Sequence, residues 1–315
     1  MTRIFACAVA LALVWAVPSP RAQQALSADD LVGTWRLVTF MRGVDGAVPE
    51  AAQGPRGLLI LDGAGNVFEF FGVGSRQEPD VPQADPQRAF SNFGGFWGRY
   101  ELEPGTGRMR FTALDGVSPN MHEATFARRV ELMDDRLTMT SVDEPHAHGG
   151  TRSTWERMPV VDHLSPLYRQ VVGFWQHEVE GRKNLETGEM LSENHRAPSL
   201  IVYTPSGFVG VHFPPLDREP FAGDAPTPEE AQAALRGYIG YFGTLGVFPG
   251  EVSHNLLSGI SPATGSILRR SAEIAGDTLT VTLQPLGGGG GRGGPPTATT
   301  VTLRRLSGEA DMLPR

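Results

Sequence analysis

The chain has 315 residues, of which 40% are hydrophobic and 20% charged, and its 35 acidic residues outnumber its 27 basic ones. Its single cysteine, Cys7, lies in the N-terminal segment, so the rest of the chain excludes disulfides, thiolate nucleophiles and cysteine-ligated metals. Without Arg3 and Arg21 of that segment, 25 basic residues remain against 35 acidic ones, a net charge of −10 that disfavours nucleic acid and anionic membrane surfaces as partners.

The N-terminus has the pattern of a Sec-type secretory signal peptide. A basic start at Arg3 is followed by the apolar run Ile4–Val17 and then by small and polar residues up to Ala25. The apolar run is too short for a spanning helix, so we expect no membrane insertion. We expect residues 1–25 to be removed and the protein to be periplasmic or extracellular.

The remaining chain contains a repeat of domain size. Val32-Gly-Thr-Trp35 returns as Val172-Gly-Phe-Trp175, 140 residues later. Further landmarks recur in the same order at offsets between 140 and 145: Phe96-Trp97-Gly98 with Tyr241-Phe242-Gly243, Arg128-Arg129 with Arg269-Arg270, and Leu137–Thr140 with Leu279–Thr282. We therefore predict two copies, 26–158 and 171–308, joined by a linker and short helix at 159–170 and followed by a tail at 309–315.

Each copy has the pattern of short strands separated by turns. In the first copy, runs rich in Val, Leu, Phe and Thr predict strands at 34–40, 57–61, 66–71, 107–114, 125–132, 136–141 and 152–157. One long helix is expected from Thr227 to Phe242, because Thr227-Pro-Glu-Glu supplies a cap and apolar residues follow at three-four spacing. The corresponding segment 79–92 is broken by prolines and is expected to be mostly loop.

Two motifs are better explained as exposed connections than as sites. The glycine run 287–294 lacks the Gly-Lys-Ser/Thr ending of a phosphate loop, and His146-x-His148 falls on the equivalent connection of the first copy. We expect no metal site and no cofactor.

The tryptophans that begin the copies carry a resemblance. Gly33-x-Trp35 and Gly173-x-Trp175 look like the start of the first lipocalin strand. With 200–207, 238–244, Val252-Ser-His254 and 276–280, the second copy resembles the bacterial and fungal lipocalin-like domain family. The resemblance implies an all-β fold of two tandem lipocalin-like antiparallel β-barrels, about eight strands each, with one helix in the second. It also implies that an arginine from the last strand covers each tryptophan within about 6 Å. These pairs are Arg157 on Trp35 and Arg305 on Trp175.

Strand alternation indicates which side chains enter each barrel. In 66–71 we expect the acid Glu69 to face outward, which turns Asn66, Phe68 and Phe70 inward; their counterparts in the second copy are Phe208, Gly210 and His212. In 109–113 the inward set is Met109, Phe111 and Ala113, with the counterparts Val252, His254 and Leu256. Two inward phenylalanines of the first copy are thus histidines in the second.

These replacements indicate a polar site within an apolar second barrel. Histidines there would stay neutral and could hydrogen-bond or transfer a proton, although satisfied core histidines have the same pattern. Tyr203 and Tyr241 are the nearest further polar candidates, Phe208 would line the site, and Arg218 at a barrel mouth could meet a carboxylate or carbonyl.

Three functions fit this pattern. The first is a secreted binder of a small, mostly apolar molecule, oriented by His212 and His254. The second is an isomerase, cyclase or hydratase of a lipophilic substrate, with His254 as acid or base assisted by His212 or Tyr203. The third is a structural envelope protein whose barrels are filled by side chains. The oligomeric state is not indicated.

Overall fold

The computed structural model describes residues 26–42, 56–73, 85–142, 150–195, 198–223, 225–260, 265–283 and 296–313. The predicted signal peptide, the glycine run 287–294 and His146-x-His148 lie outside these ranges. Within them, no helix is long and apolar enough to cross a membrane. The same part of the chain contains no group of three or more His, Cys, Asp or Glu side chains that could hold a metal ion.

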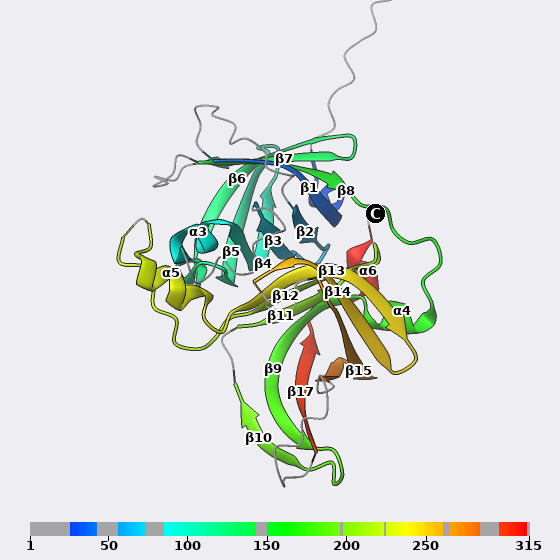
Figure 1. Ribbon diagram of the computed structural model, residues 1–315. Helices are drawn as coiled ribbons and strands as arrows, with labels where there is room; N and C mark the ends of the chain where they lie inside the picture. The colour runs from blue at the N-terminus through cyan, green and yellow to red at the C-terminus, as the bar shows by residue number, and fades with distance from the viewer. Residues whose placement is uncertain are drawn as a thin grey trace, which may run out of the picture.

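The chain forms two closed antiparallel barrels of eight strands each, which confirms the predicted fold class (Figure 1). In barrel 1 each strand pairs with the next, and β1 pairs with β8 to close the sheet. Its strands are β1 (Gly33–Arg42), β2 (Arg56–Leu61), β3 (Asn66–Gly72), β4 (Phe93–Glu103), β5 (Arg108–Gly116), β6 (Thr125–Met133), β7 (Arg136–Val142) and β8 (Thr151–Arg157). The sequence analysis predicted no strand at the position of β4.

Barrel 2 has the same order and is closed by the pairing of β17 with β9. The short strand β10 pairs with the far end of β9, and β11 pairs with its beginning. The eight strands of the closed barrel are β9 (Gly173–Asn184), β11 (Leu200–Tyr203), β12 (Phe208–Phe213), β13 (Ile239–Phe248), β14 (Glu251–Gly259), β15 (Ile267–Ala275), β16 (Thr278–Leu283) and β17 (Thr297–Arg305), and β10 (Met190–Asn194) is an additional ninth strand of the sheet.

The helices of the described residues are short. They are α1 (Ala28–Leu31), α3 (Pro86–Ser91), a single 3-10 turn η1 (Pro119–Met121), α4 (Pro166–Val171), α5 (Pro228–Leu235) and α6 (Glu309–Met312). The predicted capping box at Thr227 begins α5, but the extension of this helix to Phe242 was wrong. Gly237 adopts a φ of +73°, a left-handed conformation that ends the helix, and the following residues form β13. The segment expected to be mostly loop contains α3, which packs against α5.

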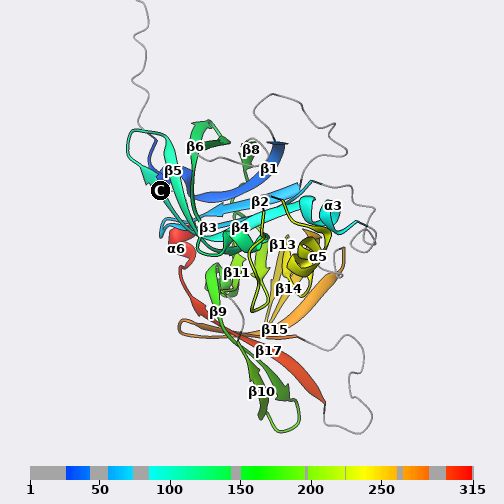
Figure 2. The same cartoon turned by 90° about the vertical axis from the view of Figure 1, so that its left-hand side faces the viewer.

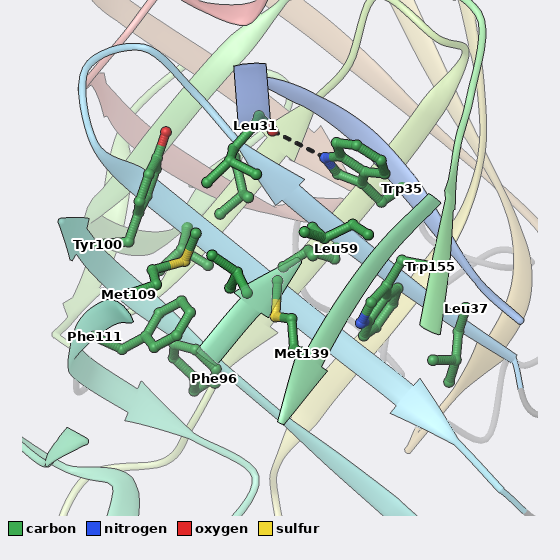
Figure 3. Packing of buried hydrophobic residues seen from close by; sticks show 14 of the residues in the cluster. Leu31, Trp35, Leu37, Leu59, Phe96, Tyr100, Met109, Phe111, Met139 and Trp155 are labelled. Carbon is green, nitrogen blue, oxygen red and sulfur yellow. Dashed lines mark hydrogen bonds between the residues drawn. The ribbon is translucent and has the colours of Figure 1, made fainter. Parts of the chain in front are cut away.

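Each barrel is closed at one end by its first tryptophan. In barrel 1 the Trp35 indole donates to the Leu31 carbonyl at 3.0 Å (Figure 3). Arg157 Cζ lies 4.0 Å from the centroid of the Trp35 ring. In barrel 2 the Trp175 indole donates to Val171 at 2.7 Å, and Arg305 Cζ lies 4.0 Å from its ring. Both separations are within the 6 Å range of a cation–π contact, and both arginines come from the last strand of their barrel.

The two barrels pack against each other through an apolar interface. The outer faces of β2, β3 and β4 meet the outer faces of β9 and β11 to β13, and the barrels lie close together in both views (Figures 1 and 2). Phe68 packs so closely on the backbone of Gly210 that a Cβ there would lie 2.4 Å from the ring. The Trp97 indole also donates to the Pro198 carbonyl across the interface, at 3.1 Å. The strands at this interface therefore have buried side chains on both faces, and their outer faces hold the two barrels together.

This interface overturns one of the two predicted strand orientations. Phe68 and Phe70 belong to the interface cluster, whereas Glu69 points into barrel 1. The ion pair with Arg128 on β6 offsets the cost of burying the Glu69 carboxylate inside the barrel. The counterpart strand follows the same pattern, so Phe208 and His212 face the interface rather than the interior of barrel 2. On β5 and β14 the predicted inward sets are confirmed, since both contribute to the barrel cores.

Candidate functional site

Four polar side chains meet inside barrel 2, in an interior built mainly from apolar residues. They are Tyr203 on β11, Tyr241 on β13, His254 on β14 and Arg270 on β15, here called the barrel 2 quartet. The Tyr203 hydroxyl lies 3.1 Å from His254 Nε2, and the Tyr241 hydroxyl lies 2.8 Å from Nδ1. Arg270 donates from Nη2 to the Tyr241 oxygen at 3.2 Å. The structure thus brings together the histidine and both tyrosines singled out from the sequence.

Strand alternation explains why these groups converge. Val252, His254 and Leu256 alternate on β14 and all point inward, so the histidine is surrounded by the apolar core. Tyr241 reaches it from the neighbouring strand, and Tyr203 reaches it from across the barrel. Tyr203 and His254 are 0% exposed, and Arg270 is 7% exposed.

The direction of the hydrogen bonds in the quartet follows the tautomer of His254. Arg270 can only donate, so the Tyr241 oxygen accepts from it, and when His254 carries its ring proton on Nε2 the Tyr241 hydroxyl donates to Nδ1. Nε2 of a neutral imidazole then carries the ring proton and donates it to Tyr203. In this tautomer, no hydrogen bond within the described residues uses the Tyr203 hydroxyl proton. With the ring proton on Nδ1 the chain reverses and the unused proton is that of Tyr241, so either tautomer leaves one tyrosine hydroxyl donor inside the barrel.

Burial keeps all the titratable rings of the quartet neutral. Burial lowers the pKa of His254 well below its ordinary value, and the positive charge of Arg270 lowers this pKa further. Burial likewise raises the pKa of Tyr203 and of Tyr241, so both stay protonated donors. The charge of the site at neutral pH resides on Arg270.

His212 belongs to the interface and is separated from His254 by the β-sheet. Its Nε2 donates to the Glu69 carbonyl of barrel 1 at 3.0 Å, and its Nδ1 accepts from the Tyr238 hydroxyl. The ring packs on Phe68 and Phe70, with centroid distances of 4.8 and 5.5 Å. Burial lowers the pKa of His212 to about 3, with a smaller contribution from Arg218. His212 thus binds the barrels together as a neutral ring.

Arg218 also connects the two barrels. It forms an ion pair with Asp115 of β5 at 2.9 Å, donates to the Gly116 carbonyl at 2.7 Å and to that of Val117, and stacks 5.0 Å from the Tyr238 ring. The carboxylate and carbonyls that the sequence led us to expect for this arginine are therefore those of barrel 1. Neither Arg218 nor Phe208 reaches the quartet.

Barrel 1 contains a buried ion pair that the sequence analysis missed. Glu69 receives two hydrogen bonds from Arg128, one of them from Nη2 at 3.1 Å, and the Glu69 side chain is 2% exposed. The guanidinium lies 5.3 to 5.6 Å from the ring centroids of Phe96, Phe111 and Phe126. Arginine carries a weakly hydrated charge, which suits such an aromatic surrounding.

A hollow of about 280 Å³ opens into barrel 1 beside this ion pair. Its wall is mostly apolar, and the charged groups that line it, Glu69 and Arg128, neutralise each other. The aromatic lining residues are Phe40, Phe71, Phe90, Phe93, Phe96 and Phe126. Filling of barrel 1 by its own aromatic side chains is therefore incomplete.

The residue of the quartet that sequence reasoning missed is Arg270. The doublet Arg269-Arg270 was recognised only as a landmark that matches Arg128-Arg129. Consecutive residues of a strand point to opposite faces, so one arginine of each doublet had to point inward. That signal was present in the sequence.

Comparison with known proteins does not assign a family. No protein-family model matches the chain, and no curated protein matches it. Among solved structures, a candidate outer membrane protein of Bacteroides fragilis NCTC 9343 is 10% identical with a TM-score of 0.23, covering 88% of this chain and 98% of its own. A protein of unknown function of the DUF3598 family from Nostoc punctiforme PCC 73102 is 10% identical with a TM-score of 0.21, covering 87% and 96%. Similarity this low supports no statement about function, and the lipocalin-like family remains a prediction.

Proposed function

We propose that this protein is a non-catalytic binder that holds a small, mostly apolar molecule inside barrel 2, outside the cytoplasm. The observation that carries the proposal is the barrel 2 quartet, in which a buried cation adjoins a chain of hydrogen bonds within a mainly apolar interior. Binding sites for small molecules combine such apolar walls with a few placed polar groups that fix orientation. Arg270 and the Tyr203 hydroxyl supply those groups.

The enzymatic alternative uses His254 as a proton donor or acceptor. A general acid or base must come within hydrogen-bond reach of the substrate. Both ring nitrogens of His254 are already engaged by tyrosine hydroxyls, and His212 lies on the other side of the sheet. These contacts favour a positioning role for His254 and disfavour an isomerase, cyclase or hydratase.

A specific observation favours a second candidate location for the ligand. The hollow of barrel 1 is apolar, has a volume near the lower end of ligand pockets, and contains charges that are internally paired. It suits a neutral apolar molecule. The same hollow disfavours a structural protein whose barrels are both filled.

Native mass spectrometry of the purified full chain tests the proposal. We expect an adduct that is released on denaturation and that is lost in His254→Phe, which installs the phenylalanine of the equivalent barrel 1 position. His212→Phe is the matched control, because it makes the same exchange at the interface and should keep the adduct. Absence of an adduct, or its loss in the control variant alone, would contradict binding in barrel 2. Thermal unfolding of both variants checks that they remain folded.

A further inference from the structure

The two barrels carry an inward arginine at the same structural position. Arg128 of β6 lies opposite Met109 of β5, and Arg270 of β15 lies opposite Val252 of β14, its counterpart. Both guanidinium groups are surrounded mainly by the apolar core of their barrel. The repeat therefore provides an internal comparison of how each barrel compensates a buried cation.

The compensation differs between the copies. In barrel 1, Glu69 lies on β3 between Leu59 and Phe96 of the neighbouring strands and neutralises Arg128. The residue in this place in barrel 2 is Val211, between Ile201 and Tyr241. Among the described residues, Arg270 hydrogen-bonds to the Tyr241 hydroxyl at 3.2 Å and to the Leu268 carbonyl at 3.4 Å, and no carboxylate of these residues forms an ion pair with it.

An uncompensated buried charge is unfavourable, since desolvation of the ion is offset only by a counter-ion or a full set of hydrogen bonds. The hydrogen bonds available near Arg270 cannot supply a negative charge. The protons of the quartet that have no hydrogen bond among the described residues are those of the remaining guanidinium N–H groups and, in the Nε2-protonated tautomer of His254, the Tyr203 hydroxyl proton. The complementary partner is a group that only accepts and that carries a single negative charge.

We propose that the molecule bound in barrel 2 is an apolar carboxylic acid, whose carboxylate pairs with Arg270 and accepts from the Tyr203 hydroxyl. This inference rests on the proposed function and adds the chemical class of the ligand. The Glu69–Arg128 pair of barrel 1 has the geometry expected for this complex, since a planar carboxylate there accepts two hydrogen bonds from a guanidinium. A phosphate monoester, with close to two charges, would leave one charge uncompensated in the same interior.

Isothermal titration calorimetry of the full chain with octanoate and with 1-octanol, at neutral pH, tests this proposal. We expect octanoate to bind roughly 10- to 100-fold more tightly than 1-octanol, as expected for hydrogen bonds to a charged group. Val211→Glu should abolish this preference by restoring an internal counter-ion, and Arg270→Met should abolish it by removing the cation. Val211→Glu reproduces the charge pair of barrel 1, so it keeps the test available if Arg270→Met does not fold.

Each remaining outcome contradicts a defined part of the account. If octanoate and 1-octanol bind equally well, the carboxylate inference fails and apolar binding stands. If the octanoate preference persists in both variants, the acid binds elsewhere and Arg270 is not its partner. If neither compound binds and no molecule co-purifies with the chain, the proposed function fails together with the inference.

Discussion

Replacing Glu69 by valine would give barrel 1 the arrangement found in barrel 2. Glu69→Val leaves Arg128 inside the barrel with three phenylalanine rings around it and no carboxylate. The variant therefore measures, in a barrel that holds its own counter-ion, the free energy that an anionic ligand would supply to Arg270.

The expected cost follows from burial. The Glu69 side chain is 2% exposed and that of Arg128 is 15% exposed, and removal of one partner from a buried ion pair costs about 3–5 kcal/mol. The guanidinium keeps its cation–π contacts and adjoins the hollow, so we expect a loss of about 3 kcal/mol, at the lower end of that range. The double variant with Arg128→Met removes both charges and should lose less than about 1.5 kcal/mol, because the replaced pair becomes apolar.

Urea unfolding followed by tryptophan fluorescence is the assay. Trp35, Trp97 and Trp155 all belong to strands of barrel 1, so the signal reports mainly on that barrel. A loss below about 1 kcal/mol in Glu69→Val would refute the reasoning, since a buried lone cation should cost more. A double variant as unstable as the single one would refute it too, since the defect would then not be the unpaired charge.

Three further outcomes are expected from the interface between the barrels. Burial lowers the pKa of His212 in the folded state to about 3, so the neutral ring stabilises the fold fully above the ordinary histidine pKa of 6.5, and this stabilisation is lost as the pH falls toward 3. Urea unfolding should therefore show about 1.4 kcal/mol less stability per pH unit below 6.5. His212→Phe should remove this pH dependence. Arg218→Met leaves the buried Asp115 carboxylate without its counter-ion and should lower the free energy of unfolding by about 3 kcal/mol in the same assay. A loss below about 1 kcal/mol would show that the ion pair is dispensable. Gly210→Ala places a methyl group against the Phe68 ring and should lower thermal stability by about 1–3 kcal/mol, with an unchanged melting temperature as the contrary result.

The features that the sequence predicted correctly are local or repeated. Alternation of Arg110 and Thr112 with apolar neighbours indicated the inward face of β5, and the repeat transferred this face to His254. Because both strands face solvent on one side, their polar residues mark that side.

The strand with Glu69 could not be interpreted in this way. All seven residues of β3 are buried, since one face lines barrel 1 and the other packs on barrel 2. On such a strand a carboxylate faces whichever side holds its cation, and that cation, Arg128, lies 59 residues further along the chain. The interface role of His212 was hidden for the same reason.

The overextended helix has a different cause. Tyr238 and Phe242 continue the three-four spacing of α5, but they belong to the turn and strand that follow Gly237. Both side chains are buried in the interface between the barrels. Apolar spacing alone does not distinguish a helix face from a strand that is buried on both sides.

The most direct test of the central claim is the titration of octanoate, labelled with carbon-13 at its carboxyl group, in complex with the full chain by NMR. Pairing with Arg270 predicts that the carboxyl pKa of the bound acid lies well below that of free octanoate, and that Val211→Glu removes the shift. A bound carboxyl whose pKa equals or exceeds that of the free acid would contradict the account, because an apolar barrel without an available cation raises it.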